Sequence, residues 1–63
     1  MSITLEEATS LAGISDWTLT PSQQKFLIES TEDLLTRHPK EWFLEPQNQN
    51  RFKVELEQIF KEV

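Results

Sequence analysis

The single histidine and the carboxylates that follow it are the residues whose types could support metal or acid–base chemistry. His38 precedes Glu41 and Glu45 at spacings that would bring the three side chains together on one helix. Pro39 and Pro46 bracket this stretch, however, and proline interrupts a helix, so we interpret His38 as a helix C-terminal residue. A carboxylate-bridged pair of metals in a helical bundle would also require a second histidine.

The remaining residue types disfavour other kinds of catalysis. The chain has no cysteine, so it lacks a thiol nucleophile, a disulfide and the usual zinc ligand set. No serine lies in a glycine-flanked turn of the nucleophile-elbow type, and a chain with one glycine has no glycine-rich phosphate-binding loop. We therefore expect a protein that is not an enzyme, with no catalytic residue, metal, cofactor or small-molecule substrate.

Acidic residues are concentrated in the first half of the chain, whose net charge is −5. Residues 1–36 contain six acidic residues and one lysine, whereas residues 37–63 carry five residues of each sign. An acidic surface repels the phosphates of nucleic acids and anionic lipids, and it can attract a basic patch on another protein. Most such surfaces are simply solvated, but acidic mimicry of nucleic acid is a third functional hypothesis beside the two given below.

The first predicted helix covers residues 5–12. Thr4 and Glu7 have the spacing of a capping box at its start. Gly13, the only glycine, follows at the position that favours a left-handed conformation after a helix.

A second helix is predicted over residues 21–37. Thr20 suits its N-cap and Pro21 suits its first position, where the missing backbone N–H costs nothing. The helix is expected to end before Pro39, because the residue preceding a proline avoids the α conformation. A short helical turn is expected near residues 39–44.

The last helix is predicted to cover about residues 48–62, after a polar loop at residues 45–50. Its apolar residues follow helical spacing and comprise Phe52, Leu56, Ile59, Phe60 and Val63. The predicted fold class is all-α: a small three-helix bundle in which residues 1–63 form a single helical domain.

Residues 4–15 resemble the first helix and turn of helix-turn-helix regulators, in which a small residue and a glycine shape the turn. The resemblance covers about 12 of the 63 residues and implies DNA binding through the second helix. Two features oppose it: residues 16–20 delay that helix, and Lys25 is its only cation before Arg37. A helix-turn-helix-type DNA-binding regulator is therefore the alternative hypothesis.

Aromatic residues are the most informative excess in the composition. Trp42, Phe43 and Leu44 are consecutive, and in a helical turn their side chains spread over about 200°, so at least one is expected to reach the surface. These three residues could close one side of the core or form a patch that faces a partner, and the sequence leaves both interpretations open. Phe26 lies off the apolar stripe of its predicted helix. We predict that the partner-binding residues are Trp42, Phe43, Leu44 and Phe26. The exposed member of the run at residues 42–44 should form part of a contiguous apolar patch with neighbours such as Phe26.

The favoured functional hypothesis is a small acidic protein–protein interaction module: a regulatory, adaptor or assembly subunit that binds another protein or self-associates. The N-terminus lacks the basic residues of a signal peptide. The longest apolar runs are three residues, against roughly 20 for a membrane span. A cytoplasmic location without a membrane partner is therefore expected, and nucleic acid is not expected as a partner.

Overall fold

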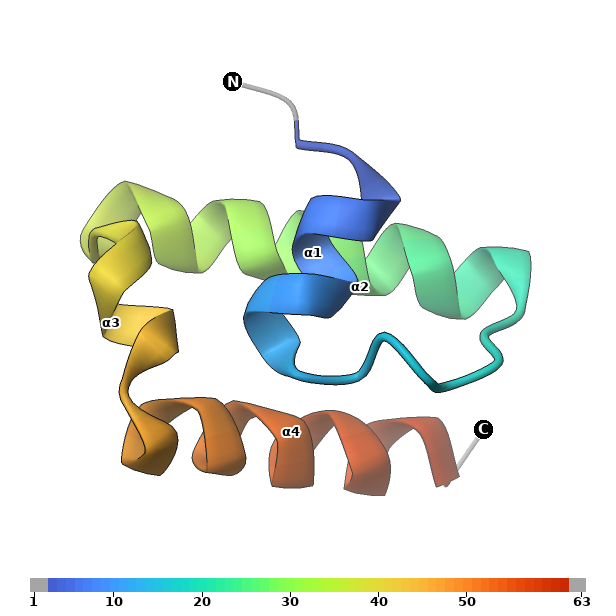
Figure 1. Cartoon of the computed structure of the whole chain (residues 1–63). Coiled ribbons are helices and arrows are strands. Elements are labelled where there is room, and N and C mark those ends of the chain that lie inside the picture. Colours follow the sequence, from blue (N-terminus) through green and yellow to red (C-terminus); the bar gives the residue numbers. More distant parts are fainter. Residues whose placement is uncertain (1–2, 62–63) are drawn as a thin grey trace.

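Four helices account for most of the computed structural model, which describes residues 3–61 and contains no strand among them. They are α1 (Leu5–Ala12), α2 (Pro21–Arg37), α3 (Lys40–Leu44) and α4 (Pro46–Lys61). Figure 1 shows the two long helices, α2 and α4, running in opposite directions, with α3 joining them at one end and α1 packed across them. The predicted all-α bundle is confirmed, and the helical turn predicted near residues 39–44 is α3.

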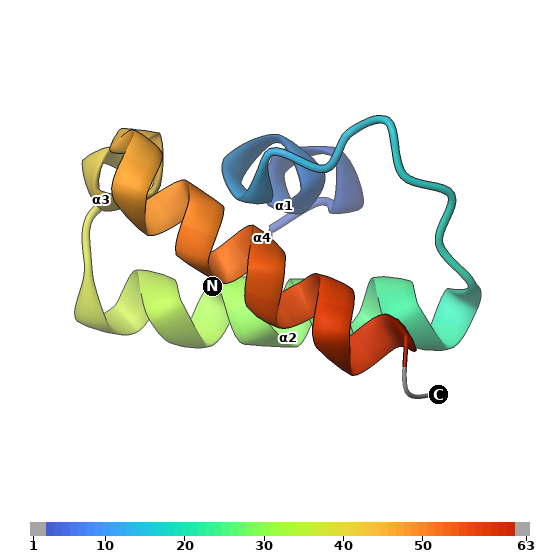
Figure 2. The ribbon, with the colours of Figure 1, turned by 90° about the horizontal axis from the view of Figure 1, so that it is seen from below.

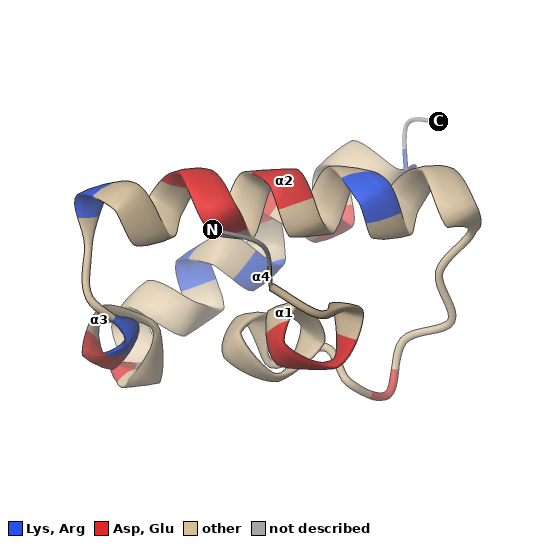
Figure 3. Ribbon diagram, turned by 90° about the horizontal axis from the view of Figure 1, so that it is seen from above, with Lys and Arg blue, Asp and Glu red and all other residues tan. Residues whose placement is uncertain are grey.

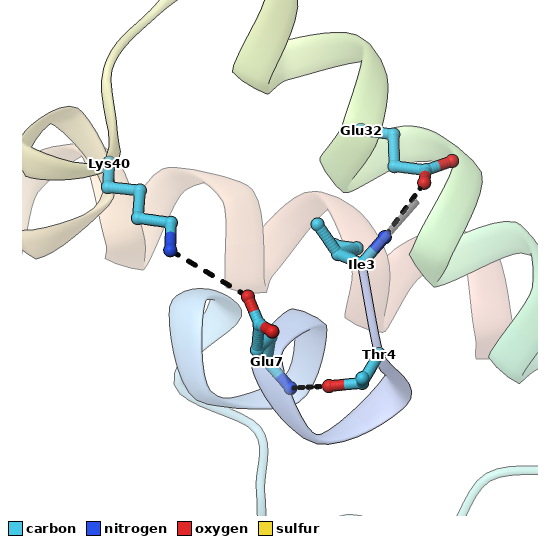
Figure 4. Close-up of polar contacts among 5 residues, drawn as sticks. All are labelled: Ile3, Thr4, Glu7, Glu32 and Lys40. Carbon is cyan, nitrogen blue, oxygen red and sulfur yellow. Dashed lines mark hydrogen bonds and ion pairs between the residues drawn. The ribbon is translucent and has the colours of Figure 1, made fainter. Parts of the chain in front are cut away.

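The ends of α1 follow from the predicted signals, with one difference. The Thr4 Oγ1 accepts the backbone N–H of Glu7 at 3.1 Å, and Gly13 adopts the left-handed conformation, with φ of 71°. Only this half of the predicted capping box forms, because the Glu7 carboxylate lies instead 3.7 Å from the Lys40 ammonium group on α3 (Figure 4). The side chain predicted to close α1 on itself thus ties α1 to another helix.

The ends of α2 agree with the prediction. Thr20 and Gln23 form the complete capping box, in which the Thr20 N–H donates to the Gln23 side chain at 2.9 Å and the Gln23 N–H donates to the Thr20 hydroxyl at 3.3 Å. At the other end His38 is extended, with φ of −137° and ψ of 150°, as expected for a residue before proline.

The loop predicted at residues 45–50 is wrong, because α4 begins at Pro46, two residues before the predicted start near residue 48. Proline is well suited to a first helical position, and the preceding Glu45 has the extended conformation that proline imposes. The Gln49 N–H donates to the Glu45 carbonyl at 3.0 Å and closes the first turn. The predicted helix end at residue 62, and Val63 with it, lie outside the described residues.

The core lies between α1 and the other helices and uses small residues where helices approach closely. Its fully or nearly buried apolar residues are Ala8, Ala12, Ile14, Leu27, Phe43, Phe52 and Leu56. Two of them are alanines on one face of α1, which bring its backbone close to its neighbours. Figure 2 shows α4 crossing α2 obliquely, with α1 and the connector at residues 13–20 lying to one side.

Candidate protein-interaction surface

The consecutive apolar residues of α3 divide between the core and the surface. Phe43 is fully buried and packs edge-on against Phe52, with ring centroids 6.0 Å apart. Trp42 is half-buried and stacks on His38 with ring centroids 4.4 Å apart, whereas Leu44 is 67% exposed. The expectation that at least one of the three reaches the surface is confirmed. Phe43 itself belongs to the core in this fold and has no surface to offer a partner.

The other predicted partner-binding residue, Phe26, lies on α2 and is 39% exposed. Its ring packs edge-on against Phe60 near the end of α4, with centroids 5.9 Å apart. Phe26 lines a surface hollow with Leu34 and Phe52, and Trp42 lines a second hollow that shares those two residues. Phe26 and Trp42 are thus connected, but through residues of α2 and α4 that the predicted patch did not include.

We name these two adjoining hollows the α2–α4 groove; their volumes are about 250 and 200 Å³. Its base is apolar and consists of Leu34, Phe52 and Leu56, the last two being almost completely buried. Phe26 and Ile59 stand at one end, both about 40% exposed, and Trp42 stands at the other. The remaining lining residues are Ser30, Asp33, Arg51 and Glu55.

Ile59 is the groove residue that sequence reasoning placed wrongly, because its helical spacing assigns it to the buried stripe of the last helix. The structure leaves it 40% exposed, beside the buried Leu56 and the half-buried Phe60. The five apolar positions predicted for the last helix form a stripe wider than one crossing helix can cover. This width was the sequence signal that one of them would stay exposed. Two other exposed apolar side chains, Leu44 and Val54, line none of the hollows that form the groove.

The two edges of the groove differ in charge. On α2, Glu29 and Asp33 are four residues apart, so they lie on one line of the helix, next to Phe26 and Ser30. Figure 3 shows these acidic positions in the middle of α2, with basic residues near its two ends. Asp33 is 3.5 Å from the guanidinium of Arg37.

On α4, the opposite edge of the groove is balanced. The Arg51 guanidinium is 3.9 Å from the Glu55 carboxylate, and both side chains are largely exposed. The α2 edge is therefore acidic at its centre, whereas the α4 edge carries one charge of each sign.

A second acidic area adjoins the α2 edge beside Ile3. A hollow there is lined by Ile3 and Leu35 together with the carboxylates Glu29, Glu32 and Asp33. The Ile3 N–H donates to the Glu32 carboxylate at 3.0 Å (Figure 4), so this carboxylate holds the segment that leads into α1. The first turn of α1, which follows this segment directly, carries Glu6 and Glu7.

The structure separates the residues first considered for metal chemistry. His38 stacks on Trp42, and Glu45 is the extended residue before Pro46. Among residues 3–61, no three histidine or acidic side chains gather closely enough to hold a metal ion.

The segment that resembles a helix-turn-helix keeps the long connection noted in the sequence. Residues 13–20 separate α1 from α2, and the exposed side of α2 presents Glu29 and Asp33 together with Lys25. Carboxylates on a helix repel the phosphate backbone that a recognition helix must approach.

Comparison with known proteins supplies no relative for this fold or surface: no family model, curated protein or solved structure matches the chain. None of the helices within residues 3–61 has the length and apolar character needed to cross a membrane.

Proposed function

We propose that this protein is a non-catalytic protein–protein interaction module that binds its partner in the α2–α4 groove. The observation that carries the proposal is the pair of exposed apolar side chains, Phe26 and Ile59, at the end of a groove whose base is the hydrophobic core. Contiguous apolar surface on a small protein marks an interaction site more often than scattered exposed residues do. Aromatic and large aliphatic side chains that protrude next to a hollow are typical interface anchors.

A matched pair of substitutions on one helix tests this proposal. Ile59→Ser removes an anchor of the groove, and Val54→Ser removes a side chain of similar size and exposure (44%) that lies outside the groove. Affinity capture from the native lysate, read by mass spectrometry, should recover a specific partner with the unmodified protein and with Val54→Ser, but not with Ile59→Ser. Truncating an anchor typically costs about 2 kcal/mol of binding energy, close to a thirtyfold loss of affinity. Equal capture by both variants would refute the groove as the binding surface.

The acidic side of α1 and α2 supports a second candidate, acidic mimicry of nucleic acid. Glu6 and Glu7 lie in the first turn of α1, α2 carries Glu29, Glu32 and Asp33, and the segment that leads into α1 is bonded to Glu32. Such a surface would compete with DNA or RNA for a basic protein. Under this candidate, capture would enrich nucleic-acid-binding proteins, and it would be lost on neutralising Glu6 and Glu29 but retained in Ile59→Ser.

A further inference from the structure

The dimensions of the α2–α4 groove restrict the kind of segment that it can hold. Its lining runs from Phe26 to Leu34 on α2 and from Arg51 to Ile59 on α4. Each stretch is nine residues long, and the rise between its two end residues is about 12 Å, or roughly two helical turns. The groove lies between two helices, and residues 3–61 contain no strand whose edge could pair with an extended peptide. A helix that places apolar residues at i, i+3, i+4 and i+7 toward the groove matches this length and its apolar base.

The charges along the edges specify the flanks of such a helix. Asp33 lines the groove itself, and Glu29, one turn before it on α2, lies about 60° around the helix from Phe26, at the edge of the apolar lining. The Arg51–Glu55 pair leaves the α4 edge without net charge. A bound helix with lysine or arginine on the flank facing α2 would therefore meet opposite charges there, whereas its other flank would meet a balanced edge.

A second copy of this chain fits the groove less well than a basic partner. Each copy has a net charge of −5, so association would bring two acidic molecules together. The exposed faces of α1 and α2 carry Glu6, Glu7, Glu29 and Asp33. On α4, basic and acidic residues are interspersed, so none of these three helices offers a purely basic stripe complementary to the α2 edge; the charged residues concerned are Arg51, Lys53, Glu55, Glu57 and Lys61. Charge complementarity favours a different protein as the occupant.

We infer that the α2–α4 groove binds one amphipathic helix of a partner protein, and that this helix carries basic residues on the flank that faces α2. The inference rests on the proposed function and adds the chemical class of the partner. The apolar anchors of the helix pack beside Phe26, Ile59 and Trp42, and its basic flank lies along Glu29 and Asp33.

Three fluorescein-labelled peptides of about 18 residues test the inference by fluorescence anisotropy. The first has leucines at helical spacing with lysines on one flank, the second replaces the lysines by glutamates, and the third has the composition of the first in scrambled order. The first peptide should bind the full chain at least about tenfold more tightly than either of the others, because only it supplies both the apolar stripe and the complementary charge. Equal binding of the lysine and glutamate peptides would overturn the inference.

Two double variants with equal net charge separate the α2 edge from general electrostatic attraction. Glu29→Gln with Asp33→Asn removes the acidic edge, and Glu45→Gln with Glu57→Gln removes two exposed carboxylates that lie outside the groove. The first double variant should bind the lysine peptide about threefold to tenfold more weakly, since each screened surface pair contributes modestly, and the second should bind it unchanged. An equal loss in both would overturn the placement of the basic flank.

Backbone amide shift mapping with the lysine peptide distinguishes failure of this inference from failure of the proposed function. Shifts centred on Phe26 and Ile59 support both, and shifts centred on Val54 contradict both. If no peptide binds, yet Ile59→Ser still abolishes capture of the native partner, the helical occupant is wrong and the interaction function stands. If Ile59→Ser instead abolishes a concentration-dependent dimer measured by light scattering, the occupant is a second copy and the inference is overturned.

Discussion

The two sides of α2 use apolar residues in different ways. Ala8 and Ala12 on α1 and Leu27 and Thr31 on α2 are all completely buried, and α1 and α2 pack against each other. Toward α4, Phe26 is 39% exposed, and Ile59 on α4 is 40% exposed. Small side chains let helix backbones approach until no gap is left, whereas bulky side chains on obliquely crossing helices keep them apart. Burial on the first side stabilises the fold, and the surface left on the second side is available for binding.

Polar contacts reinforce the same contrast. On the α1 side, the Gln49 side chain donates to the Leu11 carbonyl at 3.1 Å, and the Ile3 N–H donates to Glu32 at 3.0 Å. These bonds join residues far apart in the chain, and each is partly buried, which makes its loss costly. The ion pairs beside the groove join residues four apart on one helix and are largely exposed. They do not fix α2 against α4.

The largest expected effect compares neighbours in α3. Phe43→Ala removes a fully buried ring and should lower the free energy of unfolding by about 3–5 kcal/mol, which leaves little of the stability of a small domain. Leu44→Ala, at a side chain that is 67% exposed, should lower it by less than about 0.5 kcal/mol. Urea unfolding followed by circular dichroism measures both, and similar losses would contradict the division of α3 between core and surface.

A smaller loss is expected where α4 touches the C-terminus of α1. Gly13 has φ of 71°, and a Cβ there would lie 3.0 Å from the Gln49 Cδ. Gly13→Ala should therefore cost about 1–3 kcal/mol, through backbone strain and through displacement of the side chain that bonds Leu11. Gln49→Ala alone should cost about 1 kcal/mol. If displacement of Gln49 contributes to the cost of Gly13→Ala, the variant with both substitutions will lose less free energy of unfolding than the sum of the two single losses. Thermal or urea melts measure these losses.

Substitution of Thr31 should stabilise the closely packed side. Its hydroxyl is buried on α2 without a hydrogen-bond partner, so no hydrogen bond offsets the free-energy cost of removing the hydroxyl from water. Thr31→Val keeps the branched shape and removes that cost, so the free energy of unfolding should rise by about 1 kcal/mol. A melting temperature equal to or below that of the unmodified protein would show that the hydroxyl finds a partner in solution. Ser30→Ala, on the groove side of the same helix, is the control and should change stability little.

The smallest effect is expected for the exposed ion pair that crosses between helices. Glu7 and Lys40 are 3.7 Å apart, and about half or more of each side chain is exposed. Glu7→Gln should change the free energy of unfolding by less than about 0.5 kcal/mol, because solvent screens such pairs. This loss of unfolding free energy should vanish in 1 M salt. A larger loss that does not depend on salt would mean that the Glu7–Lys40 contact stabilises the fold as the buried contacts do.

The sequence predicted the fold where local signals determine it. Thr4, Gly13, Thr20 and Pro21 mark helix ends through their own backbone preferences, so the bounds of α1 and α2 follow from the chain itself. Pro46 misled the prediction because a proline suits both a loop and the first position of a helix.

The binding surface was less predictable, because it depends on how helices are placed relative to one another. Phe43 turns inward and Leu44 outward according to the rotation of α3, which the docking of α3 on α4 determines. Ile59 stays exposed because α4 crosses α2 obliquely, a relation that no single helix encodes (Figure 2). Phe26 could be identified because its position off the apolar stripe is a property of one helix.

The bond from Gln49 to Leu11 has a consequence for how the chain reaches its native state. An isolated helix of eight residues is too short to persist in water, so α1 depends on its neighbours to form. One of its last carbonyls is bonded by a side chain 38 residues away, on α4. The amide hydrogens of α1 should therefore exchange with solvent only when α4 detaches, and the two ends of the chain should open as one cooperative unit. A fragment that stops before α4 should contain no stable α1, although every residue of that helix is present.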